Sequence, residues 1–186
     1  MKPWKRIEPT EVTAVGYRTV VSKTFVLNNG KTFDFQTNDV EGREYAGVVA
    51  LTKDNRVLIA RQFRPGPEKI MEEIPGGYVD PEDKGDICAA AARELEEETG
   101  YKPGKIIYLG KVYKDCYNNA VWHYCLATDC APNKQGQALE ATEDVEVDII
   151  SIKQFLANAR EGRMTDPGAV LLAYETLSRL AQAQSK

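Results

Sequence analysis

Apolar and polar residues alternate along much of this chain, and the alternation predicts strands separated by short turns. The first forty residues show it as Val12–Val21 and Ser22–Thr37, with Asn28-Asn29-Gly30 as a hairpin turn. Further strands are predicted at Tyr45–Leu51, Arg56–Gln62, Ile70–Ile74, Lys105–Tyr113, Val121–Thr128 and Val145–Ser151. We therefore expect a small antiparallel β unit over residues 1–42 that precedes a main domain over 43–186.

Three segments interrupt the strands with helical patterns. The first surrounds Arg93–Tyr101, and the others are Ile152–Glu161 and Ala169–Ala183, the last preceded by an Asp166-Pro167 start signal. Strands mixed with a few helices predict an α/β sandwich in which helices cover a sheet.

Composition narrows the classes of function. The chain has 186 residues, a formal net charge of −4 and one histidine. That charge argues against broad nucleic-acid binding, and no apolar run is long enough to span a membrane, so we expect a cytoplasmic protein. Cys88, Cys116, Cys125 and Cys130 show no paired metal-ligand spacing, which favours reduced thiols. His123 lies in an alternating run and is predicted to be a strand residue.

The most informative segment is the acidic helix that ends near Gly100. Alanines, Leu95 and four glutamates favour a helix, Asp86 fits its N-cap, and Gly100 supplies a stop. At about 100° per residue, Glu94 and Glu98 project into the middle of the apolar stripe. Glu97 lies at the edge of the stripe, and Glu96 points away from it.

An acidic run is usually a solvated surface, and that interpretation is the alternative here. A helix that only solvates its glutamates would place them opposite its apolar face. This helix turns carboxylates toward its own core side, where an unpaired charge is costly. Clustered carboxylates suit a hard cation, so the pattern predicts Mg²⁺, with Mn²⁺ as an alternative ion.

The run from Arg93 to Tyr101 resembles the signature of the Nudix hydrolases, because every fixed position of its R-E-(apolar)-x-E-E-x-G-(apolar) half is filled. The upstream half departs from the family pattern. Gly77 lies two residues too far from Arg93, and Gly85 stands where the family has a glutamate. Glu82 and Asp83 are both candidates to replace that glutamate.

Segments outside the signature are similar to those of ADP-ribose pyrophosphatases. They are Arg61-Gln62-Phe63-Arg64-Pro65 and Glu72-Glu73-Ile74-Pro75-Gly76-Gly77, in which Gly76 stands at an alanine of the family motif. The resemblance implies hydrolysis of the diphosphate in ADP-ribose to AMP and ribose 5-phosphate. GDP-mannose or another nucleotide sugar is the alternative substrate.

The resemblance also implies roles for individual residues. Glu94, Glu97, Glu98 and the carbonyl of Gly76 would hold the metal, and Arg93 would orient a carboxylate. Arg64 is expected to contact the diphosphate because its planar fork matches phosphate oxygens, with a surface salt bridge as the alternative; Arg61 and Glu73 are further substrate-binding candidates. A general base is expected in the loop 132–144, where Glu143 fits best and Glu140 is second.

The sequence leaves two other functions open. A Nudix-fold module could sense a nucleotide without cleaving it, although the intact glutamate set favours an enzyme. An isoprenoid diphosphate isomerase would need a cysteine acid, and Cys88 is not obviously placed for that. The N-terminal hairpin unit is too small to be stable by itself, so we expect a homodimer.

Overall fold

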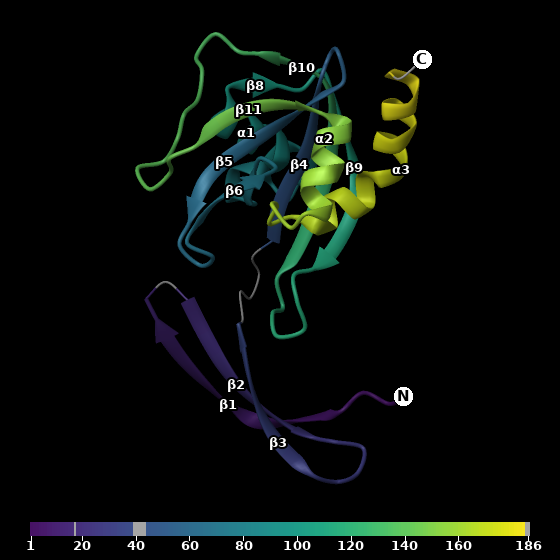
Figure 1. The fold of residues 1–186 in the computed structure, drawn as a ribbon. Helices are drawn as coiled ribbons and strands as arrows, with labels where there is room; N and C mark the ends of the chain where they lie inside the picture. The colour runs from purple at the N-terminus through teal and green to yellow at the C-terminus, as the bar shows by residue number, and fades with distance from the viewer. Residues whose placement is uncertain (17, 39–43, 185–186) are drawn as a thin grey trace. The chain divides into compact units, whose positions relative to one another are not determined.

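The computed structural model describes residues 1–16, 18–38 and 44–184, which form two compact units (Figure 1). Unit 1 contains the chain up to Arg43 together with Tyr113–Val121, and unit 2 contains Glu44–Val112 and Trp122–Lys186. The predicted boundary at residues 42 and 43 did not include the later segment.

Unit 1 is a three-stranded antiparallel sheet in the order β1-β2-β3, with β1 at Lys5–Val15, β2 at Arg18–Val26 and β3 at Thr32–Asn38. The predicted hairpin is present, because Gly30 donates its N–H to Leu27 and Leu27 donates to Lys31. The single strand predicted at Val12–Val21 is wrong. Gly16 adopts a φ of +61°, a conformation that favours glycine, and ends β1 there.

Unit 2 is built around an eight-stranded sheet whose main path is β11-β5-β4-β10-β8. Strand β6 pairs with β5, β7 with β4, and β9 with β10. The strands have these bounds: β4 Glu44–Thr52, β5 Arg56–Arg64, β6 Lys69–Glu73, β7 Gly76–Tyr78, β8 Tyr101–Lys102, β9 Lys105–Tyr113, β10 Val121–Pro132 and β11 Glu146–Ser151.

Three α-helices cover this sheet: α1 Ile87–Thr99, α2 Ile152–Arg160 and α3 Pro167–Gln184, with a short 3₁₀ turn η1 at Pro81–Asp83. In Figure 1, α2 and α3 lie in front of the sheet and α1 lies behind it. The mixed sheet between helices confirms the predicted fold class. In the part of the chain that the structure describes, no helix is both long and apolar enough to cross a membrane.

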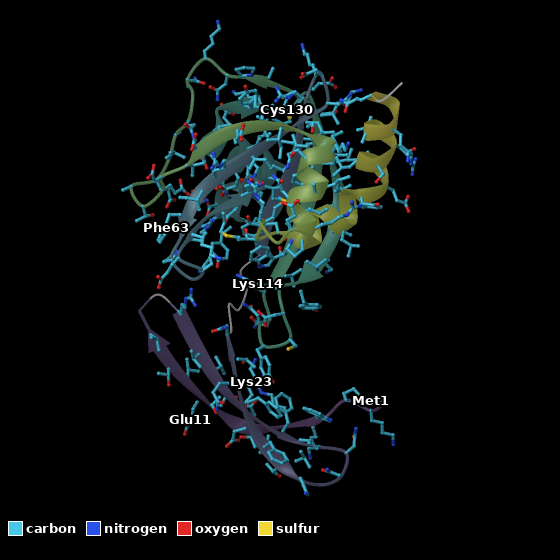
Figure 2. All side chains as sticks on the ribbon, viewed as in Figure 1. Met1, Glu11, Lys23, Phe63, Lys114 and Cys130 are labelled. Carbon is cyan, nitrogen blue, oxygen red and sulfur yellow. The ribbon has the colours of Figure 1, made fainter. Side chains whose placement is uncertain are left out.

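Strand alternation divides the core into two clusters, one on each face of the sheet. The α2 and α3 side contains Val49, Leu51, Ile59, Tyr124 and Phe155, all at most 1% exposed. The other side packs α1 against the sheet through residues Ala46, Val48, Leu58, Ala91, Leu95 and Cys125. Figure 2 shows side chains filling the space between sheet and helices. Because α1 packs through its small residues, its glutamates come close to the sheet.

Candidate active site

Helix α1 begins and ends as the sequence predicts. The Asp86 carboxylate caps its start by accepting the N–H groups of Cys88 and Ala89 at 2.9 and 3.1 Å. Gly100, with a φ of +73°, ends it, and its N–H donates to Glu96. These two residues fix the length of the helix and therefore which glutamates face the sheet.

The four glutamates of α1 divide as the angular argument predicts. Glu94 is 8% exposed and Glu98 is 5% exposed, whereas the Glu97 side chain is 40% exposed. Glu96 points elsewhere, to Lys102 Nζ and Asn133 Nδ2, each 3.0 Å from its Oε1. The two most buried carboxylates are thus the two that the sequence placed in the apolar stripe.

Both buried carboxylates have raised pKa values. Burial raises the pKa of Glu98 to about 8, and the neighbouring charges of Glu94, Glu143 and Glu73 add to the shift. Burial also raises the pKa of Glu94 to about 7, although the Arg93 guanidinium opposes the rise. Like charges buried side by side are costly, so this arrangement favours a proton or a cation between them.

Arg93 neutralises one side of the cluster. Its Nη1 donates to Glu94 at 2.9 Å and to Glu97 at 2.8 Å, and its Nη2 donates to Asp83 at 3.0 Å and to the Tyr78 carbonyl. The contact with Glu97 agrees with the expectation that Arg93 orients a carboxylate, a role that stays a prediction. The hydrogen bonds that Arg93 donates to Asp83 in particular raise the pKa of Arg93, so it stays a permanent cation at this corner.

Asp83 is a buried carboxylate of the upstream loop and contacts Arg93. It is 8% exposed, accepts from Arg93 Nε and Nη2, and also accepts the Asp80 N–H at 2.8 Å. Glu82 in the same turn is exposed. Of the two candidates to replace the family glutamate, Asp83 is therefore the one that is buried against Arg93, and its equivalence to that glutamate stays a prediction.

Two adjacent glycines bring β7 close to these carboxylates. The N–H of Gly76 donates to Glu98 Oε2 at 3.2 Å. A Cβ on Gly76 would lie 2.6 Å from Tyr45 Oη, which explains why this chain has glycine where the family motif has alanine. A Cβ on Gly77 would lie 2.5 Å from Glu94 Cδ, so Glu94 uses space that only glycine leaves free.

Arg64 and Glu73 form a pair on the same sheet face as α1. Arg64 donates to the Glu73 carboxylate through Nε at 2.7 Å and through Nη2, and Gln62 Nε2 also donates to Glu73. This hydrogen bonding raises the pKa of Arg64, whose side chain remains 44% exposed. Glu73 is buried and holds the guanidinium, which leaves a half-exposed cation facing solvent. The substrate-binding roles of both residues stay predictions.

Arg61 is not brought together with Arg64. The two lie three positions apart on β5 and so point to opposite faces of the sheet. Arg61 pairs with Glu146 at 3.6 Å and lines a cavity of about 250 Å³ with Glu72 and Arg163. A contact between Arg61 and a ligand held by α1 would have to cross the sheet.

The loop after β10 is tied to the end of α1. Gln137 Nε2 donates to the carbonyls of Glu98 and Val145 at 2.6 and 3.1 Å, and the Ala138 N–H donates to Glu97. This anchoring brings Glu143 near enough to raise the pKa of both buried glutamates of α1. The role of Gln137 was missed, because nothing in the sequence distinguishes it from its loop neighbours.

Glu140 and Glu143 differ in their surroundings. The Glu143 carboxylate accepts the N–H of Glu140 at 2.8 Å, which fixes the turn between them. Glu143 thus lies near the buried carboxylates, and its hydrogen bond with the Glu140 N–H fixes its side chain. Which of them acts as a base stays a prediction.

The donor chemistry of the cluster fits a hard divalent cation. Among the described residues, no three His, Cys, Asp or Glu side chains lie close enough together to enclose a metal ion, because Glu97 is turned toward Arg93. Glu98 has no ion pair with a basic side chain in the described chain, although it is nearly buried beside Glu94. A cation held by Glu94, Glu98 and the Gly76 carbonyl would relieve that repulsion.

Comparison with known proteins agrees with this geometry. The NUDIX domain model matches residues 42–168, so the chain belongs to the Nudix family. It is 28% identical over 171 residues to "ADP-ribose pyrophosphatase" of Bacillus subtilis, covering 84% of this chain and 91% of that one. It is 27% identical to "Methanol dehydrogenase activator" of Bacillus methanolicus, covering 80% and 87%.

A solved structure described as "Crystal structure of ADP compounds hydrolase" shares the fold. Its TM-score is 0.79 at 22% identity, over 96% of each chain. The family resemblance drawn from Arg93–Tyr101 is confirmed, and the protein is a Nudix hydrolase. Nudix hydrolases generally use divalent metal cations, in agreement with the carboxylate cluster.

Proposed function

We propose that this protein is a Mg²⁺-dependent hydrolase of ADP-ribose that releases AMP and ribose 5-phosphate. The observation that carries the proposal is the pair of buried carboxylates, Glu94 and Glu98, beside the Gly76 backbone, with the Arg64 cation near enough for the Glu98 charge to help raise its pKa. The substrate is supported by the relatives described as ADP-ribose and ADP-sugar pyrophosphatases.

Each residue would have a separate part in the reaction. A bound Mg²⁺ supplies charge neutralisation at the diphosphate and a more acidic water. Glu94 and Glu98 hold the ion with the Gly76 carbonyl, while Arg93 keeps Glu97 and Glu94 oriented. Arg64, held by Glu73, binds a phosphate oxygen through charged hydrogen bonds. Glu143 accepts the proton of the attacking water, and the water oxygen ends on one of the two phosphate products.

A substrate panel tests the specificity. The protein is incubated with Mg²⁺ and ADP-ribose, GDP-mannose and other nucleotide sugars, and the products are separated by chromatography. We expect ADP-ribose to give the highest kcat/KM, with AMP and ribose 5-phosphate in equal amounts. Equal rates on all members would contradict the ADP-ribose assignment. Absence of hydrolysis with every member would support the non-catalytic sensing module instead.

We also propose that unit 1 pairs with a second copy of the chain. Its sheet exposes large apolar side chains, including Val12 at 65%, Val15 at 60% and Phe33 at 50%. A three-stranded sheet with so much exposed apolar surface is typical of an interaction site. Sedimentation at micromolar concentration should show a dimer, and a monomer would contradict the proposal.

A further inference from the structure

Two of the four cysteines, one on α1 and one on β10, have their sulfur atoms in contact. Cys88 is in the first turn of α1, and Cys125 is on β10, 37 positions later. Their Sγ atoms are 3.4 Å apart. A disulfide has an S–S length of about 2.05 Å, so closing the bond needs a movement of about 1.4 Å shared between the two side chains.

We propose that Cys88 and Cys125 are an oxidation site that forms an intramolecular disulfide on exposure to a hydroperoxide, joining the start of α1 to β10. The site lies outside the carboxylate cluster, and its formation does not depend on the proposed substrate. The same helix carries Glu94 and Glu98, so the bond would fix the position of the helix that presents them.

The two thiols have different access to solvent, which assigns the order of the steps. Cys88 is partly exposed and Cys125 is buried. Burial, followed by the hydrogen bond with Cys88, raises the pKa of Cys125, so it remains a thiol at neutral pH. The hydroperoxide therefore reaches Cys88 first, and Cys125 waits beside it as the resolving thiol.

The chemistry is balanced with the hydroperoxide as oxidant. The Cys88 thiol releases its proton, the thiolate attacks the peroxide oxygen, and the O–O bond breaks. Cys88 becomes a sulfenic acid, and the leaving hydroxide or alkoxide takes up the released proton and departs as water or an alcohol. The Cys125 sulfur then attacks the Cys88 sulfur. The S–S bond forms, the S–OH bond breaks, and the departing hydroxide takes the Cys125 proton as water.

The surroundings of Cys88 favour disulfide formation with Cys125 over further oxidation of the Cys88 sulfenic acid. Both cysteines pack with the apolar cluster between α1 and the sheet, among Ala91, Leu95 and Ile106. A resolving thiol at 3.4 Å competes with a second peroxide molecule that would have to enter this region. Cys116 is exposed, and Cys130 is a separate buried thiol whose pKa burial raises to about 11.

Peptide mapping of the oxidised full-length protein tests the proposal. The Cys116→Ser variant, which removes the exposed thiol, is treated with hydrogen peroxide and digested without reductant. We expect a cross-linked peptide that contains Cys88 and Cys125, lighter by two hydrogens and released by dithiothreitol. Because the bond closes a loop of 37 positions, Tm should rise by roughly 5–10 °C and return on reduction.

Two variants serve as controls. In Cys88→Ser, peroxide should leave Cys125 reduced and Tm unchanged. In Cys125→Ala, Cys88 should accumulate as a sulfenic acid, trapped by a 1,3-dicarbonyl reagent, and then as a sulfinic acid. The mapping result stands even where Cys125→Ala fails to fold, because it uses both native cysteines.

Three results would overturn the proposal. One is that Cys88 and Cys125 stay reduced at peroxide doses that fully oxidise Cys116 in the wild-type protein. The second is a sulfinic acid on Cys88 while Cys125 is present, and the third is a cross-link from Cys88 to another cysteine.

Discussion

Acidic side chains on two sides of α1 have opposite electrostatic surroundings. On one side, Glu97 and Asp83 both accept hydrogen bonds from the Arg93 guanidinium, so each of these carboxylates has a cationic partner within the protein. On the other side, Glu98 is more deeply buried and accepts a hydrogen bond from the uncharged N–H of Gly76. The first arrangement is complete within the protein, whereas the second gains stability from an added cation.

The largest expected effect is the loss of activity when Glu98, which lies on the side without a cation, is changed. Glu98→Gln keeps the shape of the side chain and removes its charge, so kcat/KM for ADP-ribose hydrolysis should fall by about 10²–10³-fold. Without metal and at pH 9, where Glu98 of the wild type is ionised, its Tm should exceed that of the wild type, because a buried charge is gone. Glu96→Gln, which changes a glutamate that contacts Lys102, is the matched control and should stay within about twofold.

Gly77→Ala should weaken metal binding with little loss of fold. The added Cβ would collide with the Glu94 carboxylate and displace it. We expect the Mg²⁺ concentration for half-maximal activity to rise by about 10–100-fold, as measured in a metal titration. Gly66→Ala is the control, since a Cβ there has nothing within 4 Å. An unchanged Mg²⁺ requirement in Gly77→Ala would show that Glu94 does not hold the ion.

Substitutions on the side that contains Arg93 should mainly change the free energy of unfolding. Asp83→Asn removes a buried partner of Arg93 and should lower the free energy of unfolding by about 1–3 kcal/mol in urea titrations. Glu82→Gln in the same exposed turn should change it by less than about 0.5 kcal/mol. Equal effects of the two changes would contradict the assignment of Asp83 to the place of the family glutamate.

The sequence predicted α1 almost fully, because its caps and its apolar stripe are local signals. Asp86, Gly100 and the inward direction of Glu94 and Glu98 all follow from spacing along one helix. The choice between Glu82 and Asp83 could not be made, because it depends on how a loop with two inserted residues folds back onto Arg93.

Other features needed the tertiary structure for the same reason. The Tyr45 hydroxyl occupies the space beside Gly76 through pairing of β4 with β7, and Gln137 reaches α1 from a loop 39 positions later. Arg61 illustrates the opposite case. Alternation along β5 already separates it from Arg64, but the sequence does not say which face of the sheet holds the site.

Near neutral pH, the dependence of stability on pH should come mainly from Glu94 and Glu98. The pKa values of Glu94 and Glu98 are raised from 4.5 to about 7 and about 8 in the folded protein. Between pH 5 and pH 8 the folded state therefore binds protons that the unfolded chain has released, so stability falls as pH rises. In EDTA we expect a loss on the order of 5 kcal/mol in urea titrations.

Two conditions should flatten this pH dependence. Excess Mg²⁺ replaces the protons, and Glu98→Gln removes one of the titrating groups. A wild-type protein whose stability in EDTA rises from pH 5 to pH 8 would contradict the raised pKa values.

Proton release on metal binding tests the central claim most directly. At pH 7 the raised pKa values leave Glu98 mostly protonated and Glu94 about half protonated, so bound Mg²⁺ must displace protons. Calorimetric titration of Mg²⁺ into the protein at pH 7, in two buffers with different ionisation enthalpies, measures their number. We predict release of about one proton per protein in the wild type, and clearly less in Glu98→Gln. Binding of Mg²⁺ to the wild type without any proton release would contradict the account.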